Sequence, residues 1–204
     1  MLFDDTYQTI SKPAQGVFKD RGSKFLAYAY PVNTEAAVKD IVSELKSQHP
    51  QARHHCWALR LSPDRSVWRI NDDGEPSGTA GRPILNTLLS LDLTDVLVVV
   101  VRYFGGTLLG VPGLINAYKQ ATIDALNNAE IIRKTLNSLY EISFSYSRMN
   151  DVMRIVKDEN LKLRDQLYDN TCTIRAEIRR SAENRLLARF GQIEGLEYKF
   201  ISAG

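Results

Sequence analysis

An uninterrupted apolar run at residues 96–101, with the sequence VLVVVV, constrains the fold of this chain more than any other segment. Successive side chains of a β-strand point to opposite faces, so this run offers no polar face to water. The pattern predicts a strand that is covered on both sides or lies centrally in a sheet. Neighbouring segments must therefore supply that cover.

The segments around this strand alternate between strand and helix periodicity. Period-two patterns predict strands at residues 17–19, 23–32, 53–61 and 66–70, the first two forming a hairpin. Apolar residues at helical spacing predict helices at about residues 34–49, 84–91 and 112–129. Thr34 is expected to cap the first helix, and Ser77 or Thr79 the second. The charged and polar residues 130–137 are interpreted as a linker.

The last part of the chain shows a recognisable order of elements. Strand patterns at residues 140–146, 161–168, 171–178 and 196–201 enclose two helices, for which Ser147 and Ser181 are the expected caps. Asp169 and Asn170 are expected to form the turn of a hairpin. The order β-α-β-β-α-β is the split βαβ, or ferredoxin-like, arrangement. The sequence thus predicts an α+β protein of two domains, residues 1–134 and residues 135–204.

Charge is almost balanced in both halves of the 204-residue chain. Residues 1–135 hold 15 Lys and Arg against 14 Asp and Glu, and residues 136–204 hold 11 against 10. A protein that binds duplex nucleic acid nonspecifically relies on many uncompensated contacts between basic side chains and phosphates. The composition therefore argues against tight binding of that kind.

Cysteine usage and hydropathy bear on the location of the protein. Cys56 and Cys172 are the only cysteines and lie far apart, so the sequence suggests neither a disulfide framework nor a paired-cysteine zinc site. No apolar run approaches the length of a membrane span, and no basic-then-apolar signal pattern opens the sequence. We expect a cytoplasmic protein without a membrane partner.

An acidic cluster, Asp72, Asp73 and Glu75, stands at the start of the segment DDGEPSGTAGRP. Three carboxylates so close in sequence could hold a Mg²⁺ ion, which prefers oxygen ligands. The Asp-Asp-Gly sequence is also what a sharp chain reversal favours. Because no second acidic cluster follows at a fixed spacing, turn chemistry is the favoured interpretation, and no metal or cofactor is predicted.

Two glycine-rich loops each run directly into a predicted helix. Backbone N–H groups at such helix starts can bind an anion, and Arg82, Arg102 and Lys119 are near these loops in the sequence. Neither loop has the Gly-Lys-Ser/Thr ending of a P-loop, and neither matches the dinucleotide fingerprint. The alternative is that glycine permits left-handed or crowded backbone. The glycines concerned are Gly78, Gly81, Gly105, Gly106, Gly110 and Gly113.

Aromatic and basic residues offer further contact surfaces. Tyr103 and Phe104, beside Arg102, could stack on nucleic-acid bases or be core aromatics at the end of a strand. Arginines concentrated in the second domain could contact RNA or a partner, although the acids among them favour a solvated face. These arginines are Arg175, Arg179, Arg180, Arg185 and Arg189.

The run His54-His55-Cys56 resembles a set of metal ligands or a catalytic pair, but strand geometry separates its members. Adjacent residues face opposite sides of a strand, and His54 and Cys56 lie about 7 Å apart along it. A cysteine nucleophile needs its base within hydrogen-bond reach, and four zinc ligands are not present because His49 is the only other histidine. Cys56 is interpreted as a buried thiol, with the histidines bonding the acidic loop.

Three segments together resemble the signature blocks of the IMPACT family, in particular its two-domain bacterial YigZ branch. They are RHHCWALRL from Arg53, NDDGEPSGTAGRPIL from Asn71 and VVVRYFGGTLLGVPGLINAY from Val99. The resemblance spans the whole chain. One departure is that Pro112-Gly113 stands where the family often has Gly-Gly, and proline removes an N–H that an anion could use.

The resemblance implies a first domain like the second domain of ribosomal protein S5 and a second, ferredoxin-like domain. Such domains are similar to the fourth and fifth domains of elongation factor G. Eukaryotic relatives regulate translation by binding the activator of a starvation-responsive kinase, and bacterial members have been suspected of nucleic-acid binding. Some relatives carry a proline-dipeptidase label, which this sequence does not support because it offers few histidines and no paired-metal ligand set.

The sequence therefore predicts a binding protein that contacts RNA, the ribosome or a translation-associated protein through the two loops. One alternative is an enzyme, a hydrolase or an enzyme of a phosphorylated ligand, with its site at the same loops. Another is an interaction protein in which the loops only hold the domains together. No catalytic residue is assigned. The candidate binding residues are His54, His55, Asp72, Asp73, Glu75, Gly78, Thr79, Gly81, Arg82, Arg102, Tyr103, Gly105, Gly106, Gly110 and Gly113.

Overall fold

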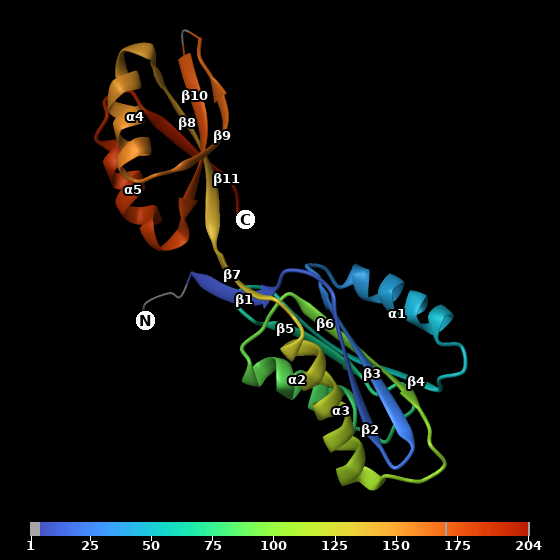
Figure 1. The fold of residues 1–204 in the computed structure, drawn as a ribbon. Coiled ribbons are helices and arrows are strands. Elements are labelled where there is room, and N and C mark those ends of the chain that lie inside the picture. The colour runs from blue at the N-terminus through green and yellow to red at the C-terminus, as the bar shows by residue number, and fades with distance from the viewer. Residues whose placement is uncertain (1–4, 170, 204) are drawn as a thin grey trace. The chain divides into compact units, whose positions relative to one another are not determined.

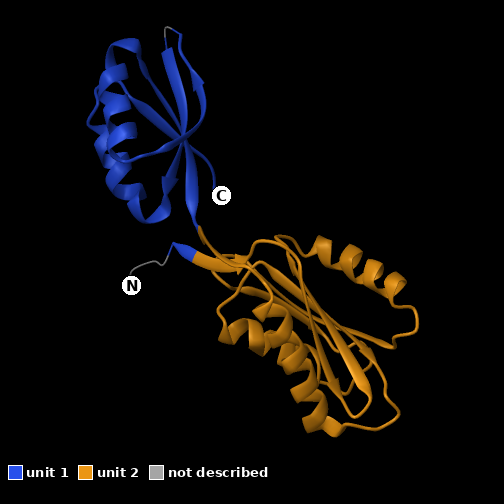
Figure 2. Ribbon diagram, in the orientation of Figure 1, with its two compact units in different colours: residues 1–6, 135–204 blue, residues 7–134 orange. Residues whose placement is uncertain are grey.

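The computed structural model describes residues 5–169 and 171–203 (Figure 1). The described chain divides into two compact units (Figure 2). One unit holds residues 7–134, and the other holds Asp5 and Thr6 together with residues 135–203. Both units combine antiparallel sheets with helices, so the chain has the α+β class that the sequence predicts. Among the described residues, no helix is both long enough and apolar enough to span a membrane.

A five-stranded antiparallel sheet forms the centre of the unit at residues 7–134. Its strand order is β2-β3-β6-β4-β5. The central strand β6 contains the apolar run at residues 96–101, all of which is buried, so the predicted central strand is confirmed. The strand bounds are β2 (Ala14–Asp20), β3 (Ser23–Pro31), β4 (His54–Leu61), β5 (Val67–Asn71) and β6 (Val96–Tyr103).

Helices cover both faces of this sheet (Figure 1). Helix α1 (Ala36–Gln48) packs on one face, where Val38 and Leu45 meet Leu97 and Val99 of β6. Helices α2 (Gly81–Ser90) and α3 (Gly110–Asn127) pack on the other face, against the alternate residues of β6. The alternation of a strand thus sends successive valines into two separate cores. This explains why residues 96–101 of β6 include no polar side chain.

Residues 130–137 are not a linker, contrary to the sequence interpretation. Strand β7 (Ile131–Thr135) pairs with β1 (Thr6–Ile10) in a two-stranded sheet, and β8 begins at Asn137. Additional backbone bonds hold β1 in place, including Ser11 N–H to the Glu130 carbonyl at 2.9 Å. Short strands whose partners are far apart in sequence give no local turn signal, so periodicity alone missed this pair.

The unit at residues 135–203 has the predicted element order β-α-β-β-α-β. Its antiparallel sheet has the order β11-β8-β10-β9, and both of its α-helices pack on one face around a shared apolar core (Figure 1). Asn170, half of the predicted hairpin turn, lies outside the described residues. The elements are β8 (Asn137–Ser145), α4 (Met149–Asp158), β9 (Lys162–Leu167), β10 (Thr171–Arg179), α5 (Glu183–Gly191) and β11 (Glu197–Ala203).

All predicted helix caps are wrong. The residues before α1 and α2 are Glu35 and Ala80, and neither makes a side-chain cap hydrogen bond. Helices α4 and α5 are each preceded by a single 3₁₀ turn, at Tyr146–Arg148 and Arg180–Ala182, so Ser147 and Ser181 lie inside those turns and not at the helix start. Short 3₁₀ turns are frequent at helix ends and displace the cap from the position that the periodic pattern indicates.

A buried carboxylate from the start of the chain completes the unit at residues 135–203. Asp5 is almost fully buried, and its two carboxylate oxygens each accept a bond of 2.7 Å from the Arg179 guanidinium. The backbone N–H of Ser181 donates to the same carboxylate at 3.1 Å, and the N–H of Leu136 donates to the Asp5 carbonyl at 2.7 Å. The bonds from Arg179 hold the pKa of Asp5 well below its usual range.

Candidate functional site

The acidic loop between β5 and α2 is folded around the carboxylate of Asp72. That carboxylate accepts backbone N–H bonds from Gly78 at 2.9 Å, Ala80 at 3.1 Å and Gly81 at 2.8 Å. Asp72 therefore caps α2 from a position eight to nine residues upstream of the helix start. The N–H groups at the start of α2 thus meet a negative group, as the glycine-rich loop suggested, but this group is the carboxylate of the loop's own Asp72. Thr79 bonds the Pro76 carbonyl at 2.6 Å instead of capping α2.

Asp73 joins the acidic loop to strand β4. One of its carboxylate oxygens accepts the backbone N–H of His55 at 2.7 Å, and the other accepts Lys46 Nζ at 3.3 Å. The ring Nδ1 of His54 lies 2.9 Å from the Asp73 carbonyl oxygen. Because a carbonyl only accepts, Nδ1 of His54 carries the proton, and Nε2 is left as an acceptor in the neutral ring. The prediction that the histidines bond the acidic loop is confirmed.

Buried His55 should make stability depend on pH. Burial lowers the pKa of His55 below the ordinary value of 6.5, against a smaller raising effect of the nearby Asp73. The unfolded chain then binds more protons than the folded one, so the free energy of unfolding should fall as the pH is lowered through 6.5. Chemical denaturation between pH 8 and about pH 5 checks this, because the pKa of histidine in an unfolded chain is about 6.5.

A His55→Gln variant is the control for that pH dependence, because glutamine does not titrate. Its loss of stability below pH 6.5 should be smaller than that of the wild type. Equal slopes for the two proteins would mean that His55 does not carry the effect. The other two histidines, His49 and His54, are present in both proteins and cancel in the comparison.

Glu75 forms the centre of a buried polar network between the two loops. Its Oε1 accepts a bond of 2.7 Å from Arg102 and one of 2.8 Å from the Tyr118 hydroxyl. The side chains of Glu75 and Arg102 are 3% and 7% exposed, so this ion pair is shielded from water. The Arg102 guanidinium also lies over the rings of Phe25 and Phe104, at 5.5 and 5.6 Å. Glu75 thereby links the acidic loop to β6.

Sequence reasoning did not identify Tyr118 as a polar partner. The signal available was a tyrosine in an apolar stripe, since a buried tyrosine hydroxyl usually finds a partner. Cys56 Sγ lies 3.0 Å from the Asp72 carbonyl oxygen and 3.3 Å from the Tyr118 hydroxyl, so its single S–H proton has two acceptors within reach. Burial raises the pKa of both groups, so the Cys56 thiol stays protonated and is a poor nucleophile. The interpretation of Cys56 as a buried thiol is confirmed.

The second glycine-rich loop follows β6 and requires a close approach of backbone. A Cβ atom on Gly105 would lie 1.9 Å from the carbonyl carbon of Gly22 and 2.2 Å from Ser23 N, so only glycine fits. Gly106 and Gly110 have left-handed φ angles of 88° and 71°. Tyr103 is held by its hydroxyl, which lies 2.8 Å from Nδ1 of His49. By contrast, Phe104 is 53% exposed.

The two loops meet at one pocket, which we call the loop pocket. It has a volume of about 480 Å³ and is mostly apolar, with Arg53, His54, Glu75 and Arg102 as its charged or titratable lining. Four of the candidate residues, His54, Glu75, Arg102 and Gly110, are thus brought together. The complete lining is Arg53, His54, Gly74, Glu75, Pro76, Arg102, Phe104, Leu108, Leu109, Gly110, Val111 and Leu114.

Arg82 does not line the loop pocket. Its guanidinium lies 5.2 Å from the ring centre of Trp68, and it lines a separate groove of about 390 Å³ between α2 and α3, together with Gly78 and Lys119. The remaining candidates hold the loops or lie beside them without lining the loop pocket. They are His55, Asp72, Asp73, Thr79, Gly81, Tyr103, Gly105, Gly106 and Gly113.

The three carboxylates of the acidic loop point to different partners. Asp72 bonds the start of α2, Asp73 bonds β4, and Glu75 bonds Arg102 and Tyr118. In the described parts of the chain, no group of three or more His, Cys, Asp or Glu residues is arranged to hold a metal ion. Each acid therefore has a structural role in shaping the loop pocket.

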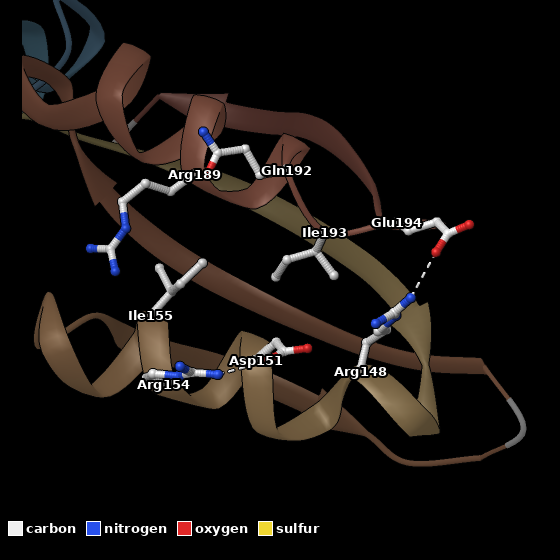
Figure 3. Close-up of a pocket in the computed structure, with 8 residues that line it drawn as sticks. All are labelled: Arg148, Asp151, Arg154, Ile155, Arg189, Gln192, Ile193 and Glu194. Atoms are coloured by element: carbon white, nitrogen blue, oxygen red, sulfur yellow. Dashed lines mark hydrogen bonds and ion pairs between the residues drawn. The ribbon is translucent and has the colours of Figure 1, made fainter.

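Arginines of the C-terminal unit are largely paired with acids. A pocket of about 460 Å³ lies between α4 and α5 (Figure 3). In its lining, Arg148 pairs with Glu194 at 2.8 Å and Arg154 with Asp151 at 2.7 Å. On the sheet, Arg175 bonds Glu141 at 2.9 Å. These pairs offset the positive charge that a phosphate backbone would need and favour the solvated-face interpretation.

Comparisons with known proteins find relatives along most of the chain. A family model described as the Impact N-terminal domain matches residues 21–126. IMPACT family member YvyE of Bacillus subtilis is 31% identical over 163 residues, which cover 80% of this chain and 75% of the relative. IMPACT family member YigZ of Escherichia coli is 34% identical over 142 residues, covering 69% of this chain and 70% of the relative. A crystal structure described as that of a hypothetical protein has a TM-score of 0.69 and 27% identity, covering 97% of this chain and 98% of that one.

Proposed function

Because the chain belongs to the IMPACT family, we propose that it is a translation-related binding protein and that the loop pocket contacts its partner. Two of the three segments that resemble the family signature supply most of the pocket lining, and the third supplies Arg53 and His54. The family resemblance implies that eukaryotic members regulate translation through a protein contact. We place the partner of this chain in the same class, a translation-associated protein in the cytoplasm.

The single observation that carries the proposal is a cluster of exposed apolar side chains on a rigid support. Phe104, Leu108 and Val111 line the loop pocket and are 53%, 81% and 52% exposed. Large apolar side chains that lie together on a surface mark sites of interaction, because their contact with water is unfavourable. The buried Glu75–Arg102 pair and the close approach of Gly105 to Gly22 hold this loop in place.

A protein fits the loop pocket better than RNA does. Binding of RNA draws on basic side chains that meet phosphates and on aromatic rings that stack on bases. The pocket wall is mostly apolar, its buried Arg102 is already paired with Glu75, and its only aromatic rings among the described residues are those of Phe104 and His54. Apolar anchors surrounded by a few polar groups are typical of protein interfaces. The co-purification experiment described below distinguishes a protein partner from contact with RNA or the ribosome.

The arrangement of elements also supports the finer fold assignment, which we include in the proposal. We assign an S5 domain 2-like fold to residues 1–134 and a ferredoxin-like fold to residues 135–204, the second unit drawing on Asp5 and Thr6 as well. The split βαβ order and the strand order β11-β8-β10-β9 support the second assignment. The layered sheet with α1 on one face and α2 and α3 on the other supports the first.

Replacing Leu108 by aspartate should abolish capture of the partner while leaving the fold intact. Leu108 is 81% exposed, so the change costs little stability, whereas a charge in an apolar anchor position weakens binding by at least about tenfold. The measurement is crosslinking in a cell extract followed by co-purification with the intact full chain as bait. Leu89→Asp is the matched control, because Leu89 is a 45% exposed leucine on α2 that does not line the pocket.

Several results would overturn the proposal. A folded wild-type bait that captures neither translation components nor RNA contradicts it, and so does equal capture by the wild type and Leu108→Asp. Treatment of the extract with ribonuclease separates the two partner classes. If the bait captures nothing after ribonuclease treatment, the partner is RNA or a particle held together by RNA. The proposed contact with a protein is then wrong.

A further inference from the structure

We infer that the loop pocket takes a partner segment in which a large apolar side chain stands close to an acidic one. This inference rests on the proposed function, because it names the chemistry of the partner at the same pocket. The volume of about 480 Å³ lies in the range of pockets that enclose a few side chains. The acidic side chain is an Asp or Glu of the partner segment itself.

The apolar part of the ligand follows from the pocket wall. Phe104, Leu108 and Val111 reach into water, and Leu109 and Leu114 continue the same surface into the core. Covering these side chains removes apolar area from water, which is the main favourable contribution in most protein association. A leucine or aromatic side chain of the partner is the group that matches this wall.

The acidic part follows from the charges around that wall. The carboxylate of Glu75 is occupied by Arg102 and Tyr118 and is 3% exposed, so it contributes little field to the opening. Arg53 is exposed, and among the described residues no carboxylate lies within ion-pair distance of it. The net charge at the opening is therefore positive, and complementary charge on the partner is negative.

An unsatisfied donor in the wall of the loop pocket points to the same ligand chemistry. Helix α3 begins at Gly110 in the pocket wall, and its N-cap residue Leu109 makes no side-chain cap bond. The Nε of Arg102, a pocket residue that is only 6% exposed, is buried without a hydrogen-bond partner. A buried N–H group without an acceptor is costly and rare in native proteins. A carboxylate from the partner would supply the missing acceptor.

The start of α2 is bonded by a carboxylate, and the start of α3 offers a comparison within the same protein. Helix α2 begins directly after a glycine loop, and the carboxylate of Asp72 accepts its free N–H groups. Helix α3 also begins directly after a glycine loop, but the described residues place no carboxylate at its start. A partner's acidic side chain at the start of α3 would reproduce the arrangement seen at α2.

A random-peptide phage library, selected against the immobilised full chain, tests the inference. The enriched peptides should carry an Asp or Glu near a leucine or aromatic residue, and they should bind Leu108→Asp at least about tenfold more weakly, a loss of about 1.4 kcal/mol. Arg53→Glu should weaken the same peptides about tenfold, and a new selection against it should no longer favour acids. Arg133→Glu is the matched control, since Arg133 is exposed on β7 and does not line the pocket.

The outcomes separate this inference from the proposed function. Peptides without acids, peptides whose binding ignores Arg53→Glu, or a selection that yields no binder would overturn the inference. If the bait still captures a translation component in a Leu108-dependent way, the proposed function stands while the acidic ligand is wrong. If acidic peptides bind in an Arg53-dependent way but no translation component is captured, the ligand chemistry stands while the proposed function is wrong.

Discussion

Replacing Glu75 by alanine is expected to destabilise the unit at residues 7–134 by about 3–5 kcal/mol, because removal of one partner leaves a buried charge uncompensated. The charge in question is that of Arg102, whose side chain is 7% exposed and whose ion-pair partner is the Glu75 carboxylate at 2.7 Å. The Tyr118 hydroxyl loses its acceptor as well. Urea denaturation of the full chain, followed by circular dichroism, measures the effect.

A double variant shows whether the cost comes from the unpaired charge. Arg102→Met alone should also be strongly destabilising, since Glu75 is then the buried charge without a partner. Together, Glu75→Met and Arg102→Met should lose much less than the sum of the two single changes. Additive losses would mean that the pair does not act as a unit. Exposed Glu44, replaced by alanine, should change stability by less than about 0.5 kcal/mol.

Replacing Asp72 by alanine has the second-largest expected effect, a loss of about 2–3 kcal/mol, because three backbone N–H groups lose a charged acceptor. These groups belong to Gly78, Ala80 and Gly81, so the acidic loop and the first turn of α2 should loosen together. Thermal denaturation gives the stability. Hydrogen exchange at the amides of Ala80 and Gly81 reports the local opening.

Asparagine at position 72 is the informative comparison for that prediction. It keeps one oxygen for Ala80 and Gly81 but replaces the other with an N–H₂ group, which cannot accept from Gly78. We expect roughly half of the loss seen with alanine. Asp40 on α1 is exposed, and its change to alanine should have little effect. If Asp72→Ala behaved like Asp40→Ala, the cap at α2 would not depend on Asp72.

The parts of the fold that the sequence predicts correctly are those with strong local periodicity. The apolar run at residues 96–101 predicts a strand covered on both faces, and β6 is that strand. The element order of residues 135–203 follows equally from local patterns. Strands β1 and β7 were missed because neither has a hairpin partner nearby, and their pairing depends on the rest of the unit being folded.

Sequence reasoning named both loops that line the loop pocket, but it did not give the contacts that shape this pocket. The interpretation that the histidines bond the acidic loop is confirmed, because His54 Nδ1 and the His55 backbone N–H both contact Asp73. The pairing of Glu75 with Arg102 joins residues 27 positions apart and could not be read from spacing. Likewise, the capping carboxylate of α2 lies eight to nine residues before the helix, beyond the reach of local cap rules.

The bond between Asp5 and Arg179 joins residues that are 174 positions apart in the chain. Residues 7–134 form their own unit between them, so during synthesis the carboxylate is made long before its arginine. The C-terminal unit can therefore reach its final state only after the whole preceding unit has left the ribosome, with Asp5 still accessible. A truncation that removes Asp5 would thus damage a unit that is made only after residues 7–134.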